Sequence, residues 1–272
     1  MKNKLIIFSK NRACQLQLLL NSIDKNADTL FDEVDVIYIY DNIEFQKGYE
    51  ILIKKYEKIN FIKENNFYTN VLKSINDNIE FTTFLVDDNV FYKNIGSPQS
   101  DILNMISSDP NVICFSLRLG LNCNYSHPAD IHYKIGTYEI NGEFLKFNYK
   151  LQRVDFAYPL SVDGHIFTTS FIKKLIITMR NFPNPNVMET KLQSFLHLSP
   201  NYIVSFKESK IVGVPVNIVN NTHPNKKGKE YPMSVEYLNQ KYINNEIIDI
   251  DKIQFDDING PHKEVEYKFS EA

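Results

Sequence analysis

Several motifs that define common enzyme classes are missing from this chain of 272 residues. It has only nine glycines, and no GxGxxG follows the first predicted strand, which argues against a dinucleotide-binding dehydrogenase. Neither GxxxxGK[ST] nor GxSxG is present, so a P-loop nucleotidase and a standard α/β-hydrolase are disfavoured. The 30 basic and 33 acidic residues give a net charge of −3. Without an excess of positive charge, nucleic acid is not expected as a partner.

Cysteines and long apolar runs are also scarce. The three cysteines, Cys14, Cys114 and Cys123, are odd in number and lack CxxC spacing, so we expect reduced thiols and no zinc site. No apolar run approaches the roughly 18 residues of a membrane span. The apolar segment 5–8 is too short for the core of a signal peptide. With 43% hydrophobic residues, the composition predicts a folded cytoplasmic protein.

Short apolar stretches alternate with helical patterns in the first half of the chain. Strands are expected at 5–8, 34–40, 60–63, 81–86 and 112–117, and helices near 16–23, 49–56 and 68–79. Strands separated by helical segments predict βαβ units and a mostly parallel sheet.

The second half shows a mixed pattern. Residues 131–149 alternate like a hairpin that is broken at the turn dipeptide Asn141-Gly142. Further strands are expected at 166–167, 203–206 and 211–219, and helices at 171–179 and 187–198. No internal repeat or long linker divides the chain, which favours one α/β domain.

The most informative motif is the triplet Asp87-Asp88-Asn89, which directly follows the strand expected at 81–86. Ligands of open α/β sheets bind at the carboxyl ends of the strands. Adjacent carboxylates repel each other unless a cation is shared, and Mg²⁺ or Mn²⁺ prefers oxygen ligands and also binds substrate phosphates. The triplet therefore predicts a metal-bridged diphosphate. A simple turn is the alternative, because Asp and Asn also suit turns.

The order of motifs resembles GT-A-type glycosyltransferases, most of all the inverting family 2 group. Ser9 and Arg12 follow the first strand, Asp41 ends the second, and the acidic triplet follows the fourth. The resemblance covers roughly residues 4–200. It implies a single Rossmann-like α/β domain with a mostly parallel central sheet, helices on both faces and a smaller mixed or antiparallel part on the acceptor side.

The same resemblance implies roles for the residues of the first half. Ser9, Arg12, Asp41 and Asp87 would bind the nucleotide. Asp88 and Asn89 would hold Mn²⁺ or Mg²⁺ on the diphosphate. Because the third place of the DxD-type motif is an amide here, the sequence leaves open whether Asp88 alone, or Asp87 with Asp88, contacts the metal.

A second match lies at residues 161–179, which resemble the acceptor-side strand and helix of that family. The resemblance implies that Glu189 is the general base that deprotonates the acceptor hydroxyl, with Asp163 as the competing candidate. Asp163 and His165 would line the sugar site. The alternative for Glu189 is a place in the first turn of a helix, where the dipole favours an acid.

Two further residues are weaker candidates. Arg118, after the strand expected at 112–117, would contact an acceptor or a phosphate, or else form a surface ion pair. His223 would be an additional metal ligand, since some GT-A relatives use a histidine near the end of the catalytic domain, or else a solvated loop residue.

The resemblance therefore implies a metal-dependent glycosyltransferase of polysaccharide or glycoconjugate synthesis. It would move a sugar from a nucleotide sugar, with UDP favoured, to a hydroxyl of a glycan or glycolipid, with inversion. The alternative is a nucleotide- or carbohydrate-binding protein without turnover. Residues 1–232 would form the catalytic domain, with a nucleotide half at about 1–120 and an acceptor half at about 121–232, and 233–272 an extension packed on it. A lipid-linked acceptor would add peripheral contact with the inner face of a membrane.

Overall fold

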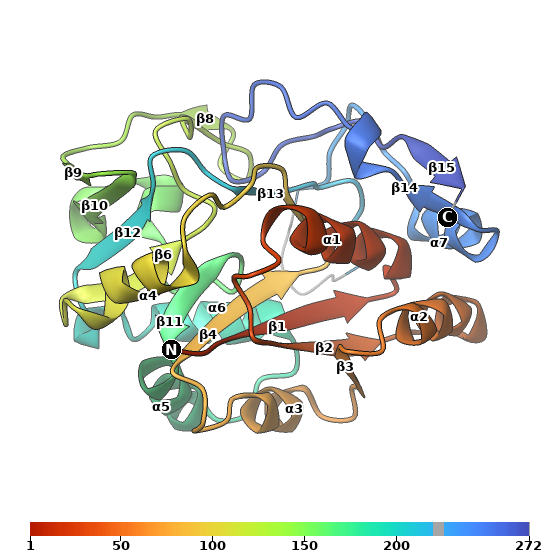
Figure 1. Ribbon diagram of the computed structural model, residues 1–272, viewed down its shortest axis with the longest axis horizontal. Coiled ribbons are helices and arrows are strands. Elements are labelled where there is room, and N and C mark those ends of the chain that lie inside the picture. Colours follow the sequence, from red (N-terminus) through yellow and green to blue (C-terminus); the bar gives the residue numbers. More distant parts are fainter. Residues whose placement is uncertain (220–225, 272) are drawn as a thin grey trace.

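A computed structural model describes residues 1–219 and 226–271 of the chain (Figure 1). Its centre is a nine-stranded sheet in the order β3-β2-β1-β4-β11-β6-β12-β10-β9. The strands of this sheet are β1 (Asn3–Lys10), β2 (Glu33–Ile39), β3 (Asn60–Lys63), β4 (Phe81–Val86), β6 (Val112–Ser116), β9 (Glu139–Asn141), β10 (Phe144–Asn148), β11 (His165–Thr168) and β12 (Tyr202–Phe206).

The direction of the strands divides the sheet into two parts. Neighbours among β1, β2, β3 and β4 are parallel, as the alternation of strand and helix patterns predicts. Strand β11 is antiparallel to both of its neighbours, β4 and β6, and β10 is antiparallel to β12 and β9. The predicted α/β fold, with a mostly parallel sheet and a smaller mixed part, is confirmed.

Seven α-helices lie in the described part of the chain. They are α1 (Ala13–Asn26), α2 (Ile43–Lys55), α3 (Phe67–Ser74), α4 (Gln99–Ser107), α5 (Thr169–Met179), α6 (Pro185–Gln193) and α7 (Val235–Ile243). Short 3₁₀ turns lie at Tyr149–Leu151, Val154–Ala157, Leu196–Leu198 and Ile250–Lys252.

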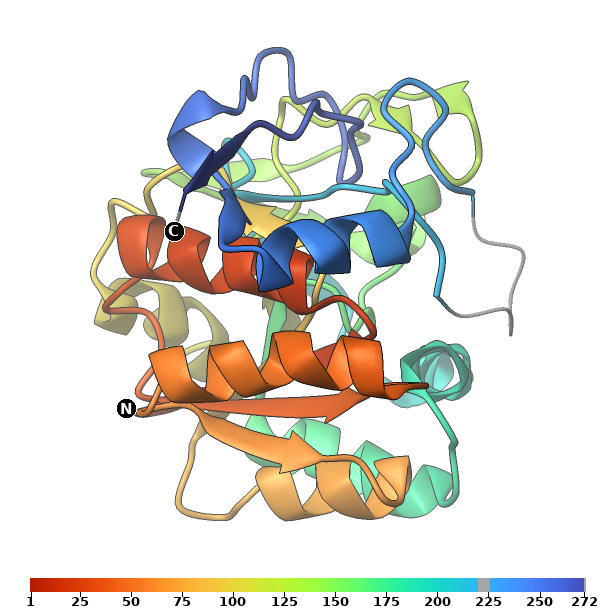
Figure 2. The same cartoon turned by 90° about the vertical axis from the view of Figure 1, so that its right-hand side faces the viewer.

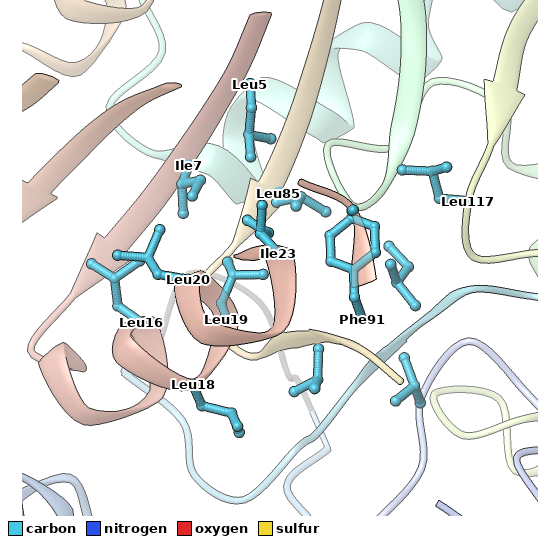
Figure 3. Close-up of a cluster of buried hydrophobic side chains, with 14 of the residues drawn as sticks. Leu5, Ile7, Leu16, Leu18, Leu19, Leu20, Ile23, Leu85, Phe91 and Leu117 are labelled. Atoms are coloured by element: carbon cyan, nitrogen blue, oxygen red, sulfur yellow. The ribbon is translucent and has the colours of Figure 1, made fainter. Parts of the chain in front are cut away.

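The helices cover both faces of the sheet because strand β1 is apolar on both sides. Leu5 and Ile7 belong to a core cluster with α1, α2, α4 and α7, and Figure 3 shows both residues facing the leucines of α1. Ile6 and Phe8 point the other way, into a cluster with α3, α5 and α6. Figure 2 shows these two helical layers on opposite sides of the strands. A continuous apolar run of this kind is typical of a central parallel strand.

Several boundaries in the second half differ from expectation. The hairpin at Asn141-Gly142 is confirmed, with Gly142 at a φ of 58° between β9 and β10. The strand expected at 211–219 is wrong beyond Gly213, because β13 covers only Ile211–Gly213 and Pro215 then lacks the N–H that a paired strand needs. The helix expected at 187–198 begins earlier and ends at Gln193.

Small strand pairs complete the fold around β13 and the C-terminal residues. They are β13 with β5 (Asn89–Phe91), β14 (Glu246–Ile248) with β15 (Phe269–Glu271), and β7 (Tyr125–Ser126) with β8 (Ile131–His132). Residues after 232 pack on the domain through α7, which contacts α1 and α2. The boundary at 232 between a domain and an extension stays a prediction.

No helix among the described residues is both long and apolar enough to cross a membrane.

Candidate functional site

A cavity of about 810 Å³ opens where strands β1 and β4 end. Because β11 is antiparallel to β4, the residues that precede β11 lie at the same edge of the sheet as those that follow β4. Gly164 makes this turn with a φ of 81°, and a Cβ there would lie 2.2 Å from a side-chain carbon of Ile211. The cavity is therefore lined from two sides, by the loops after β1 and β4 and by the segment that leads into β11.

The first wall of the cavity is built on Arg12. Its Nη1 donates to Asp87 Oδ1 at 2.9 Å and to Asp88 Oδ2 at 3.1 Å. Its Nε donates to Asn217 Oδ1 at 2.8 Å, and Nη2 donates to the carbonyl of the same residue. The backbone N–H of Lys10 donates to Asp87 Oδ2 at 3.1 Å. The guanidinium thus ties the acidic motif to the segment that follows β13.

One guanidinium faces two carboxylates in this cluster. The pKa of Asp88 is raised to about 7, chiefly by burial; the charges of Asp87 and Asp163 add to this effect, and Arg12 opposes it. Burial also raises the pKa of Asp87, although Arg12 opposes it. When both aspartates are ionised, the cluster carries more negative charge than Arg12 neutralises, and an additional cation would relieve it.

The residues of this wall fit a divalent cation that takes most of its ligands from water and from substrate phosphates. Both carboxylate oxygens of Asp87 have protein partners, whereas Asp88 uses only Oδ2 for Arg12 within the described part of the chain. In residues 1–219 and 226–271, no group of three or more His, Cys, Asp or Glu side chains is arranged to hold a metal. Mg²⁺ is commonly held by one or two carboxylates together with water and substrate phosphates. Asp88 therefore fits a cation that arrives with a diphosphate.

The opposite wall is built on Arg118. Its Nη1 forms an ion pair with Asp163 Oδ2 at 2.7 Å and donates to Ser161 Oγ at 3.1 Å. Ser161 in turn donates to Glu189 Oε1 at 2.7 Å, and the backbone N–H of Val162 donates to the same oxygen at 3.0 Å. One oxygen of Glu189 is thus held in place from two directions.

The two acids of this wall have opposite pKa shifts. Burial would raise the pKa of Asp163, but the positive charge of Arg118 opposes it, and the pKa is lowered. Burial raises the pKa of Glu189, and the charge of Asp163 adds to this effect, although the hydrogen bonds from Ser161 and Val162 oppose it. Asp163 is therefore the firmly ionised member, and Glu189 binds a proton more readily.

Helix α6 positions Glu189. The side chain of Asn184 caps the helix by accepting from Val187 N–H at 3.0 Å, and Pro185 occupies its first turn. Glu189 is the fifth residue of the helix, beyond the first turn in which the dipole would account for an acid. The helix instead directs it to the cavity, which it lines together with Asp163.

The remaining residues predicted for the nucleotide lie around the first wall. Ser9 lines the cavity, and its Oγ lies 2.7 Å from the hydroxyl of Tyr49. Asp41 is more than half exposed and accepts from Asn11 Nδ2 at 2.7 Å, with Lys10 at 3.2 Å. Asp41 lies outside the residues that line the cavity in the described structure. Their roles in binding stay predictions.

Two other candidates, Asn89 and His165, lie away from the cavity surface. Asn89 is buried, and its Oδ1 accepts from Val86 N–H at 3.0 Å, which closes the turn between β4 and β5. His165 is buried in the core with Nδ1 2.9 Å from the carbonyl of Pro159, and burial lowers its pKa to about 4. His223 lies outside the described residues. The metal and sugar roles of these residues stay predictions.

Three polar residues of the site were missed by the sequence argument. Ser161 belongs to the matched segment and could have been found from its place two residues before Asp163. Asn217 and His262 lie in irregular segments with no periodic pattern, far along the chain from their partners Arg12 and Asp163. Only the folded chain brings them to the cavity.

No protein-family model matches this chain. Its sequence is similar to a bifunctional glycosyltransferase, pgtA, of Dictyostelium discoideum, with 28% identity over 191 residues that cover 64% of this chain and 25% of the relative. The chain thus spans about a quarter of the length of that relative.

Solved structures show a distant likeness. S. aureus TarS 1–349 in complex with UDP has a TM-score of 0.49 and 18% identity, covering 78% of this chain and 60% of that chain. A complex of the same fragment with UDP-GlcNAc has a TM-score of 0.47 and 15% identity, covering 78% and 58%. A cytidylyltransferase from Leptospira borgpetersenii has a TM-score of 0.43 and 11% identity, covering 77% of each chain.

The strand order, the acidic motif after β4 and the sequence similarity to a glycosyltransferase agree with one another. Over 191 residues, this chain is therefore similar in sequence to a glycosyltransferase.

Proposed function

We propose that this chain transfers a sugar from a nucleotide diphosphate sugar to a hydroxyl group of a glycan or glycolipid. The observation that carries the proposal is the pair of carboxylate walls around one cavity, with Asp88 on one side and Glu189 on the other. Glycosyl transfer needs both kinds of group, because negative charge develops on the leaving diphosphate while the attacking hydroxyl loses a proton.

Asp88 supports the donor half of this proposal. Its carboxyl group shares Arg12 with Asp87 and has one oxygen left after pairing with Arg12 in the described part of the chain. A bound Mn²⁺ or Mg²⁺ would neutralise charge on the departing diphosphate. Ser9 and the backbone around Lys10 lie beside this position and would contact the nucleotide.

Glu189 supports the acceptor half. A general base works best when its pKa is raised toward the working pH, and burial has this effect on Glu189. Because Ser161 and Val162 hold Oε1, the other oxygen can accept the hydroxyl proton as the new bond forms to the anomeric carbon and the bond to the diphosphate breaks. Asp163 is a poorer base, since the adjacent Arg118 keeps its pKa low. Attack opposite the leaving group would invert the configuration.

A nucleotide-release assay tests the donor half directly. Wild-type protein would be incubated with UDP-GlcNAc, other UDP-sugars and a panel of glycan acceptors, with Mn²⁺ or with EDTA, and free UDP would be measured. We expect release that depends on the metal, and we expect Asp88→Asn to lower it by at least tenfold. The matched control is Asp28→Asn, an exposed aspartate outside the cavity lining, which should behave as wild type.

The same assay separates this proposal from binding without turnover. Metal-dependent binding of UDP without release of sugar from any donor would favour the binding protein. Equal release in EDTA and Mn²⁺ would remove the cation from the proposal.

A further inference from the structure

The C-terminal residues bring a histidine into the cavity. The residues on either side of His262 are hydrogen-bonded to the backbone of Gly213. The Gly213 N–H donates to the Pro261 carbonyl at 2.8 Å, and the Lys263 N–H donates to the Gly213 carbonyl at 3.0 Å. Gly213 is also paired with Asn89, the last residue of the acidic triplet. His262 is thus fixed by backbone pairing beside the strand that leads out of the donor wall.

The absence of a side chain at Gly213 makes room for the imidazole. A Cβ at this position would lie 2.7 Å from His262 Cδ2, which no ordinary contact allows. The segment is anchored a second time by Asn259, whose carbonyl accepts from the backbone N–H groups of Asn124 at 2.7 Å and Tyr125 at 3.0 Å. These contacts hold His262 in one position on the cavity wall.

The imidazole lies beside Asp163 and faces the cavity. His262 Nε2 is 3.5 Å from Asp163 Oδ2, and about a quarter of the His262 side chain is exposed, in a wall of the cavity. Burial lowers the pKa of His262 to about 4, and the neighbouring Arg118 acts in the same direction, so the ring is neutral near pH 7. A neutral imidazole and a carboxylate therefore lie side by side.

Asp163 belongs to the Arg118 wall and lines the same cavity as Asp88. Asp88, Asp163 and Glu189 all line this cavity, and the charge of Asp163 raises the pKa of the other two. In the proposed reaction, the sugar being transferred occupies the space between the diphosphate and the base. The carboxylates around this point disfavour a further phosphate, whereas a sugar hydroxyl can both donate and accept a hydrogen bond.

We propose that His262 and Asp163 together bind one hydroxyl of the transferred sugar. A hydroxyl oxygen about 2.8 Å from both atoms would donate to Asp163 and accept from the imidazole N–H. The C-terminal segment would then be part of the donor-sugar site rather than a covering layer. This inference rests on the proposed function, because it assumes that a nucleotide sugar enters the cavity.

Calorimetric binding tests this assignment on the full chain with Mn²⁺ present. Wild type would first be titrated with UDP, GDP, CDP and dTDP and then with hexose derivatives of the nucleotide that binds, beginning with UDP-GlcNAc. His262→Ala should bind the nucleoside diphosphate within twofold of wild type but the nucleotide sugar at least tenfold more weakly. His262→Gln, which retains a hydrogen-bonding side chain, should recover part of the loss. His197→Ala, at an exposed histidine outside the cavity lining, is the matched control.

The outcomes separate the two proposals. If wild type binds a nucleotide sugar and His262→Ala binds it equally well, the role of His262 is wrong and the proposed function stands. If both His262 variants lose the same factor of affinity for the nucleotide and for the nucleotide sugar, the proposed role of His262 is also wrong, because the lost contact would then not be one with the sugar. If wild type binds none of the nucleotides or their sugars, the proposed function fails, and the role of His262 fails with it.

Discussion

The two walls of the cavity are built on the same plan, each with a buried arginine that holds two acidic side chains. Arg12 contacts both Asp87 and Asp88 directly. Arg118 contacts Asp163 directly but reaches Glu189 only through the hydroxyl of Ser161. In the first cluster, the positive charge of Arg12 is shared by two adjacent carboxylates. In the second, the positive charge of Arg118 is paired mainly with Asp163.

This difference explains why the two walls suit different chemistry. In the first cluster burial raises the pKa of both aspartates, and a cation bound beside them would favour their ionised forms. In the second cluster the pKa values move apart, down for Asp163 and up for Glu189. Two carboxylates whose pKa values are separated by their surroundings can take different roles, one as a fixed charge and one as a proton acceptor.

The largest expected effect is on proton transfer. Glu189→Gln should lower glycosyl transfer by roughly 10²–10⁴-fold, the usual contribution of a general base. Binding of UDP and metal should be unchanged, because Glu189 belongs to the opposite wall. Transfer rates and UDP affinity would be measured on the same preparation, with the exposed Glu57→Gln as control. A larger loss of transfer in Asp163→Asn than in Glu189→Gln would exchange the roles of the two acids.

The next effect is on stability and compares the two arginines. Arg12→Ala leaves two buried carboxylates without their cation and should cost roughly 3–5 kcal/mol of unfolding free energy. Arg118→Ala should cost less, because Asp163 keeps His262 beside it and Glu189 keeps the backbone N–H of Val162.

Urea unfolding at pH 7.5 measures both arginine variants. The exposed Arg153→Ala is the control and should lie within about 0.5 kcal/mol of wild type. Equal losses of unfolding free energy in the Arg12 and Arg118 variants would contradict this comparison, in which Arg12 is shared by two carboxylates and Arg118 is paired mainly with one.

The smallest effect concerns the link between Arg118 and Glu189. Ser161→Ala removes one hydrogen bond to the ionised form of Glu189, which should lower kcat by about tenfold. Since this bond lowers the pKa of Glu189, its loss should raise that pKa and move the acidic limb of the kcat–pH profile to higher pH. A merely structural role of Ser161 would leave the profile in place. Ser194→Ala, an exposed serine at the end of α6, is the control.

Much of the first half of the fold could be predicted from the sequence. The strand patterns at 5–8, 34–40, 60–63 and 81–86 correspond to β1 to β4, because apolar runs between helical segments are typical of buried parallel strands. Prediction was weaker in the second half, where parallel and antiparallel pairing are mixed. The short strand β5 follows the acidic turn at once and pairs with β13, a contact that no local pattern indicates.

The candidate site divides in the same way. Asp87, Asp88, Asp163 and Glu189 could be singled out because each lies in a motif or directly after a predicted strand. Their partners could not, since Asn217 is 205 residues from Arg12 along the chain and has no motif of its own. The metal role predicted for Asn89 stays a prediction; in the structure its Oδ1 accepts from Val86 N–H in the turn between β4 and β5.

The sequence by itself determined the class of the fold, the edge of the sheet where the acids gather and the presence of two acidic motifs. These features can be predicted from local sequence pattern, because burial and the alternation of strands and helices depend on residues that are close together in the chain. Only the tertiary structure decided which arginine neutralises which acid, and that His262 of the C-terminal segment lies beside Asp163. Charge pairing and pKa depend on distances of a few ångströms between residues that are far apart in the chain, and folding alone sets those distances.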